Sequence, residues 1–138
     1  MFLYKCDVSA LHAVNPQRMA RVVRESGASA AAAIQAAAYG VVLQVDGLIV
    51  GVLPVREAEG RPVVTGAFSA HQRTEHVHSD VVREMLEMLV TELEAPAASA
   101  EVLAGDVRVF EQCGFVACGA AAGAEASPQL TRMVHTRP

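Results

Sequence analysis

The sequence predicts one α+β domain over residues 1–138, with a mixed, mostly antiparallel central sheet between helices on both faces (α/β/α layers). Two β-branched runs flank the pair Asp46-Gly47, which is typical of a tight hairpin. Residues 79–93 keep apolar side chains at a 3.6-residue period, which indicates a long amphipathic helix. Helical segments precede the hairpin and short strands follow the long helix, so the expected order is β-α-α-β-β-β-α-β-α-β-β.

The chain is expected to open with a strand and a capped helix. The apolar stretch at 2–6 predicts the strand. Pro16 suits the first position of a helix because its fixed φ is already helical, and Asn15 can then serve as the N-cap. This helix is expected to end at Gly27, before a change in composition.

An alanine-rich stretch at 29–38 predicts the second helix, because alanine is the best helix former. Ser29 is the expected cap and Gly40 the expected stop. The alternative for this stretch is a low-complexity linker.

Three consecutive antiparallel strands are expected in the middle of the chain. Residues 41–45 and 48–53 form the hairpin around the Asp-Gly turn. Residues 54–62 are interpreted as a looser connection, and residues 63–69 as the third strand. The long helix follows.

The last third is expected to alternate short elements. Residues 100–103 predict a strand, after which Asp106 can cap a brief helix that stops at Gly114. Residues 115–118 and 130–135 are expected to form a final pair of strands.

Composition excludes several classes of partner. The formal net charge is −4, the pI is near 5.7 and no cluster of Lys or Arg is present, so neither nucleic acid nor an anionic membrane is an expected partner. No apolar run reaches the roughly 18 residues of a membrane span, and the N-terminus lacks a signal-peptide layout, so a cytoplasmic location is expected. Cys6, Cys113 and Cys118 lie at unrelated spacings and are expected to be buried, unpaired thiols.

Two motifs carry a resemblance to a known family. Val-Asp-Gly-Leu-Ile-Val-Gly (45–51) is similar to the hairpin of the GNAT family of acetyl-coenzyme A dependent N-acetyltransferases, and Phe-Glu-Gln-Cys-Gly-Phe (110–115) resembles its late signature. The element order and the spacing agree over roughly residues 2–136. The resemblance implies the GNAT, or acyl-CoA N-acyltransferase, fold and acetyl-coenzyme A as cofactor.

In that family the loop before the long helix holds the coenzyme pyrophosphate on backbone N–H groups, and glycines let the phosphates approach. Laid on this sequence, Arg73 takes the family's Arg or Gln position, whereas the two glycine positions fall on His76 and His78. Each imidazole could lie where a phosphate oxygen should sit, point away, or donate a hydrogen bond to phosphate. The cofactor-binding residues that the resemblance implies are Ala70, Arg73, Thr74, Glu75, His76, Val77, His78 and Ser79.

The family's catalytic positions are also altered. Its late tyrosine, often the general acid, is Phe110, which has no proton to give, and the asparagine usually found seven positions earlier is Leu103. No catalytic base is selected by spacing. The candidate bases are Glu57, Glu59, Glu75, His71 and His76.

The histidines also suggest a metal site. His76-Val-His78-Ser-Asp80 matches the first part of the His-x-His-x-Asp-His signature of the metallo-β-lactamase fold, but Val81 stands where the last histidine is needed. A smaller zinc site from His71, His76 and His78 is geometrically conceivable. We expect no metal.

The combined changes favour a non-catalytic GNAT-like protein that acts by binding a protein partner, in a regulatory or assembly role. Small GNAT-like proteins of short-tailed bacteriophages resemble it in size and in their altered cofactor loops, which suggests a phage-encoded assembly function. The resemblance implies two ways of contacting a partner: the exposed sheet edge left by a splayed strand, or pairing of the last strands between two copies in a homodimer. The alternative is an active N-acetyltransferase that acts on a small amine or a protein amino group.

Overall fold

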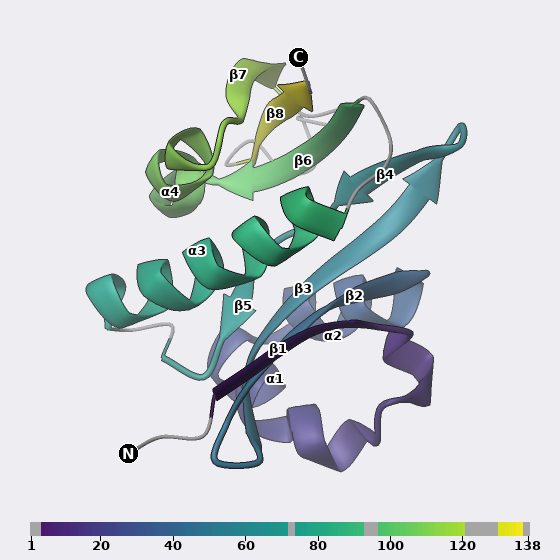
Figure 1. Cartoon of the computed structure of the whole chain (residues 1–138), viewed down its shortest axis with the longest axis vertical. Helices are drawn as coiled ribbons and strands as arrows, with labels where there is room; N and C mark the ends of the chain where they lie inside the picture. The colour runs from purple at the N-terminus through teal and green to yellow at the C-terminus, as the bar shows by residue number, and fades with distance from the viewer. Residues whose placement is uncertain (1–3, 72–73, 93–96, 121–129, 137–138) are drawn as a thin grey trace.

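The computed structural model describes residues 4–71, 74–92, 97–120 and 130–136 (Figure 1). Its eight-stranded sheet has the order β1-β2-β3-β4-β6-β8-β7, with β5 paired to β3, and the pairs are antiparallel except for β4 with β6. The strands are β1 (Tyr4–Ser9), β2 (Tyr39–Val45), β3 (Leu48–Ala58), β4 (Arg61–Val64), β5 (Phe68–Ser69), β6 (Ala97–Leu103), β7 (Val116–Ala120) and β8 (Leu130–Thr136). The α-helices are α1 (Ala20–Ser26), α2 (Ala28–Ala36), α3 (Glu75–Glu92) and α4 (Val107–Gln112), and the 3₁₀ turns are η1 (Leu11–Ala13), η2 (Pro16–Met19) and η3 (Ala104–Asp106).

Helices cover both faces of the sheet, which confirms the predicted layers. In Figure 1, α3 crosses the front of the sheet, α1 and α2 lie behind it, and α4 lies beside the strands that end the chain. The core is continuous across these layers, because side chains of α3 such as Met85 and Leu86 are buried in the same cluster as Leu53 of β3 and Phe110 of α4.

The hairpin prediction is confirmed. Asp46 and Gly47 adopt φ angles of 53° and 82°, which is the left-handed pair that a type I′ turn requires. The looser connection predicted after it is wrong, because β3 continues to Ala58 and a second tight turn follows at Glu59 and Gly60, with φ angles of 55° and 76°. The continuation was not predicted because proline lacks a backbone N–H and is unusual inside a strand. The Pro54 carbonyl accepts a hydrogen bond from the Thr65 N–H, which follows β4. Pro54 therefore turns its nitrogen toward an irregular segment, and no ladder hydrogen bond is lost there.

The predicted third strand is two short strands. β4 and β5 are separated around Gly66, whose φ of 134° breaks the extended backbone. β5 pairs with β3 alone, and β4 pairs with β6 at two positions, Val63 with Ser99 and Val64 with Ala100. Among the described residues, no ladder joins β5 to β6, and we call this interruption of the sheet between β5 and β6 the splay.

The first two helices differ from the predictions in detail. Asn15 does cap, since its side chain accepts from the Gln17 N–H at 2.9 Å, but a 3₁₀ turn precedes α1. Gly27, and not Ser29, occupies the N-cap of α2. Gly40 is no stop signal: it lies within β2, where a Cβ atom would come within 2.6 Å of the Leu53 carbonyl oxygen.

Candidate functional site

The predicted cofactor loop is mostly the first turn of α3. The helix begins at Glu75, four residues earlier than its apolar period predicts, and the His78 N–H bonds to the Thr74 carbonyl at 2.9 Å. Thr74, Glu75 and His76 are exposed, whereas Val77 and Ser79 are half-buried. Ala70 is buried at the end of β5, and Arg73 lies outside the described residues.

The two histidines at the family's glycine positions have different environments. His76 is exposed on the surface of α3. The His78 side chain points inward and is 5% exposed, with Nδ1 2.7 Å from Ser69 Oγ and Nε2 2.9 Å from Asp106 Oδ1. The sequence left three orientations open for each imidazole: at the phosphate position, pointing away from the loop, or donating a hydrogen bond to phosphate. The His78 imidazole points away from the loop.

Ser69, His78 and Asp106 form a chain of hydrogen bonds that we call the buried network. Ser69 is 0% exposed and Asp106 5% exposed, and Ser69 Oγ also accepts from the His71 N–H at 3.1 Å. In the tautomer whose Nε2–H donates to the carboxylate, Nδ1 accepts a hydrogen bond from the Ser69 hydroxyl. No buried side-chain nitrogen or oxygen of the described residues lacks a partner.

Sequence reasoning missed two members of this network. Ser69 was placed only as part of a strand, and Asp106 was predicted as a helix cap. The structure corrects the second point, because the Asp106 side chain makes no cap hydrogen bond and binds His78 instead. The available signal was weak: one serine and one aspartate next to otherwise apolar segments.

The residues at the family's catalytic positions carry no acid. Phe110 is 0% exposed and packs edge-on against Phe115, with ring centroids 5.2 Å apart. Leu103 ends β6 with an exposed side chain. Glu57 is one of the candidate bases. It lies five residues along β3 from Val52, which pairs with Phe68 of β5, and this corresponds to about 17 Å along the strand.

Metal-ligating side chains do not converge in the part of the chain that the structure describes: it holds no group of three His, Cys, Asp or Glu residues placed for a metal ion. His76 and His78 point to different environments, surface and core. The residues of the zinc hypothesis are therefore not brought together around one point.

The cysteines are more accessible than predicted. Cys6 and Cys113 are half-buried and Cys118 is exposed. Burial raises the pKa of the Cys6 thiol from 9.0 to about 11, with smaller contributions from Glu84 and Asp7, and burial also raises the pKa of Cys113. Both shifts disfavour the thiolate, so neither sulfur is an activated nucleophile.

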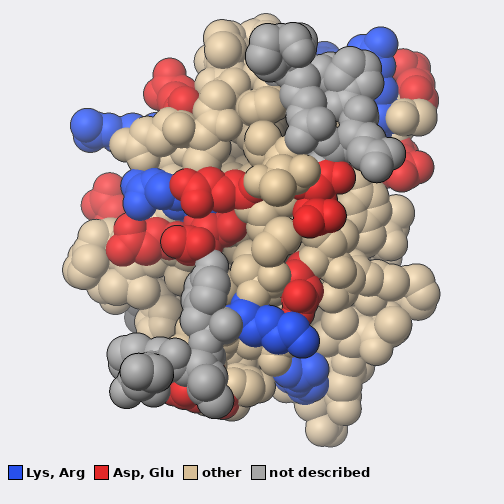
Figure 2. Space-filling view, viewed as in Figure 1, with Lys and Arg blue, Asp and Glu red and all other residues tan. Residues whose placement is uncertain are grey.

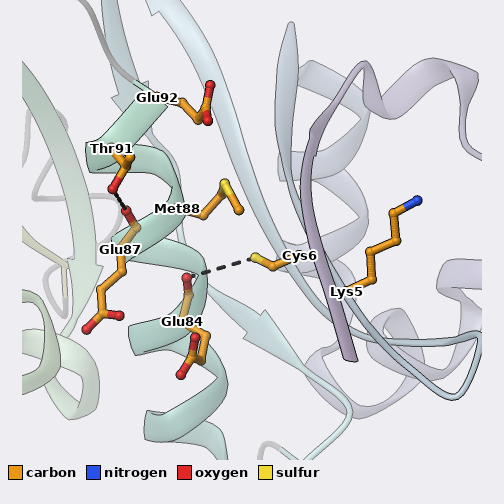
Figure 3. A pocket seen from close by; sticks show the side chains of 7 residues that line it. All are labelled: Lys5, Cys6, Glu84, Glu87, Met88, Thr91 and Glu92. Carbon is orange, nitrogen blue, oxygen red and sulfur yellow. Dashed lines mark hydrogen bonds between the residues drawn. The ribbon is translucent and has the colours of Figure 1, made fainter. Parts of the chain in front are cut away.

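A groove of about 520 Å³ lies between β1 and α3 (Figure 3). Cys6 and Met88 point toward each other across it, and the Cys6 Sγ lies 3.9 Å from the Glu84 carbonyl oxygen. Its rim carries Glu87 and Glu92. Figure 2 shows acidic side chains gathered on this side of the molecule, with basic side chains beside them.

No helix in the described part of the chain combines the length and apolar character needed to cross a membrane.

Solved structures with a similar arrangement include proteins named as acyltransferases. An IAA acetyltransferase from Bacillus cereus is 10% identical, with a TM-score of 0.65 over 98% of this chain and 100% of its own. Ard1 from Thermoplasma volcanium is 14% identical, with a TM-score of 0.65 over 96% and 98%. An acyl-CoA N-acyltransferase from Pseudomonas aeruginosa is 13% identical, with a TM-score of 0.60 over 99% and 100%.

At the level of sequence, no protein-family model and no curated protein matches the chain. At these identities the structural likeness establishes the fold. The chain has the GNAT, or acyl-CoA N-acyltransferase, fold, as its hairpin and late motif predicted.

Proposed function

We propose that this chain is a non-catalytic GNAT-fold protein that acts by binding a protein partner, in a regulatory or assembly role. The observation that carries the proposal is Phe110, whose fully buried ring stands at the position of the family's general acid and has no proton to give. His78, at a loop position where the family has glycine or alanine, is held by two hydrogen bonds inside the core and contributes to packing there.

Two of the described residues in and near the loop favour loss of the acetyl-coenzyme A reaction. Phe110 offers no proton to a leaving thiolate, and its ring is enclosed by the core. Glu75, in the first turn of α3, places a negative charge where the family binds pyrophosphate. These features support loss of the cofactor and of the transfer reaction together.

Calorimetric titration tests this proposal directly. Acetyl-coenzyme A and free coenzyme A are titrated into the protein, with thermal unfolding measured alongside. We expect no saturable heat and no rise in Tm at millimolar ligand. Saturable binding near the micromolar range would overturn the proposal and favour the active N-acetyltransferase, which an amine-substrate screen would then address.

The partner is expected to be a protein, either a second copy of this chain or another component of an assembly. β7 supports the first form: it ends the strand order of the described sheet, and its Val116 is 68% exposed. Light scattering measures the mass in solution. A dimer that Val116→Lys converts to a monomer would support pairing through β7, whereas a monomeric parent protein would leave a different protein as the partner.

A virion-assembly role is the narrowest form of the proposal. Its motivation is the resemblance of the altered loop to that of small phage GNAT-like proteins. Detection of this chain in purified virions or assembly intermediates of its source would support the role, and its exclusion from both would reject it.

A further inference from the structure

The buried network joins three elements that lie on opposite sides of the splay in the sheet. Ser69 is on β5, which is bonded to β3, and His78 is in the first turn of α3. Asp106 ends η3, the turn that leads from β6 into α4. The hydrogen bond from His78 to Asp106 therefore connects the part of the sheet ending in β5 with the part beginning at β6.

We infer that the buried network holds together the elements on the two sides of the splay, and that the contributions of His78 and Asp106 depend on each other. We call this role the clasp. The inference rests on the proposed function and deepens it, because one member of the network, His78, stands at a position of the family's cofactor loop. It assigns that position a conformational role: keeping the first turn of α3 and the start of α4 against the end of β5.

Other polar contacts between these parts are more exposed. Arg56 of β3 bonds Glu101 of β6 at 2.8 Å, and Arg83 of α3 bonds Gln112 of α4 at 2.8 Å. Water competes for such contacts, so each contributes little. The network lies in the core, where its hydrogen bonds have no solvent alternative and their loss is costly.

Burial also makes the two residues interdependent. Removing His78 alone leaves the Asp106 carboxylate in the core without the Nε2–H donor of the imidazole. Removing Asp106 alone leaves the Nε2–H without an acceptor. Removing both leaves neither group unsatisfied, so the double variant should be more stable than the sum of the single effects predicts.

The same distances would suit a nucleophile, a base and an orienting carboxylate. Ser69 is fully buried, however, and a nucleophile needs access to substrate. The geometry therefore favours the clasp, and serine reactivity becomes one outcome of the test.

A double-mutant cycle tests the clasp. Urea unfolding is measured for the parent protein, His78→Ala, Asp106→Ala and the double variant. We expect the coupling between the two positions to be at least about tenfold in the unfolding equilibrium constant, which is about 1.4 kcal/mol. Coupling below about twofold would overturn the inference. If an alanine variant does not fold, His78→Gln and Asp106→Asn take its place in the same cycle.

The exposed pair Asp80 and Arg83, 3.0 Å apart on α3, is the matched control. Its cycle through Asp80→Ala and Arg83→Ala should give coupling of less than about twofold. Equal coupling in the two cycles would show that burial does not distinguish the network, which contradicts the clasp.

Hydrogen exchange locates the effect. In the double variant, backbone amides of β5, the first turn of α3 and α4 should exchange at least about tenfold faster relative to those of β2. A uniform change over the whole chain would contradict the clasp. Labelling of Ser69 by a fluorophosphonate in the parent protein would also overturn it, in favour of a nucleophilic serine. Neither result depends on whether the parent protein binds acetyl-coenzyme A.

Discussion

The body of α3 and its first turn contact the rest of the molecule in different ways. The difference separates residues that the packing of the fold requires from residues that a ligand would require. In the body of the helix, a Cβ atom on Gly51 of β3 would come within 2.5 Å of Val81 Cγ1 and 3.0 Å of Met85 Sδ, so an added side chain would have to displace these side chains of α3. In its first turn, His78 stands where the family has glycine or alanine, and the interior accommodates the imidazole through hydrogen bonds with Ser69 and Asp106.

A glycine required by packing is fixed by its neighbours in the chain itself. Under the proposed function, a small residue that only a ligand requires can change once the ligand no longer binds. The first turn of α3 is then the place where this chain can differ from the GNAT loop without losing the fold, and the body of α3 is not.

The largest expected loss of stability comes from removing His78 in the first turn of α3. His78→Ala should reduce the free energy of unfolding by about 3 kcal/mol, because it leaves a buried carboxylate without its partner. His76→Ala, two residues earlier on the exposed surface, should change it by less than about 0.5 kcal/mol. Urea denaturation of both variants measures the difference. Equal effects would mean that the burial of His78 does not matter.

The second prediction addresses the body of the helix. Gly51→Ala should cost about 2 kcal/mol, because its methyl group must displace Val81 and Met85. Gly105→Ala is the control, since a Cβ atom there meets nothing within 4 Å. Thermal unfolding of the two variants tests the point, and a Gly51→Ala protein as stable as Gly105→Ala would show that the helix can shift without cost.

The sequence predicted those parts of the fold that depend on neighbouring residues. The turn at Asp46 and Gly47 follows from two adjacent residues that tolerate positive φ, and α3 follows from its apolar period. The break at Gly66 was missed because a glycine in a β-branched run does not reveal whether the strand bends there. Pro54 was misinterpreted because a strand tolerates proline only where the proline nitrogen faces no ladder partner. The sequence does not show which side of β3 lacks such a partner at this residue.

The candidate site was predicted as a location but not as a structure. The family resemblance placed His78 at a critical position, and sequence distance then hid its partners. Ser69 lies nine residues before it and Asp106 28 residues after it, on different elements. Only the three-dimensional arrangement of β5, α3 and η3 brings the three side chains together.

The third prediction sharpens the comparison at α4. Phe110→Tyr restores the residue type of the family's general acid, but the ring is fully buried against Phe115. The added hydroxyl should therefore cost about 1–2 kcal/mol of stability and produce no acetyl transfer. Phe110→Leu controls for loss of the aromatic pair. Acetyl-coenzyme A turnover in Phe110→Tyr would show that the cofactor site has been retained.

The smallest effect concerns Cys6, on the strand that faces α3 across the groove. Burial raises the pKa of its thiol from 9.0 to about 11, so the folded protein retains this proton between those values while the unfolded chain releases it. The contribution of this proton to the free energy of unfolding is fully present below pH 9 and is lost as the pH rises toward 11.

Alkylation by iodoacetamide, followed by mass spectrometry, reports the thiolate directly. In the folded protein the rate at Cys6 should rise with a midpoint near pH 11, and in urea near pH 9. The exposed Cys118 should react faster than Cys6 at pH 8 in the folded protein. A Cys6 midpoint that is the same with and without urea would mean that α3 does not cover this thiol. The close contact between α3 and the sheet would then be confined to the region around Gly51.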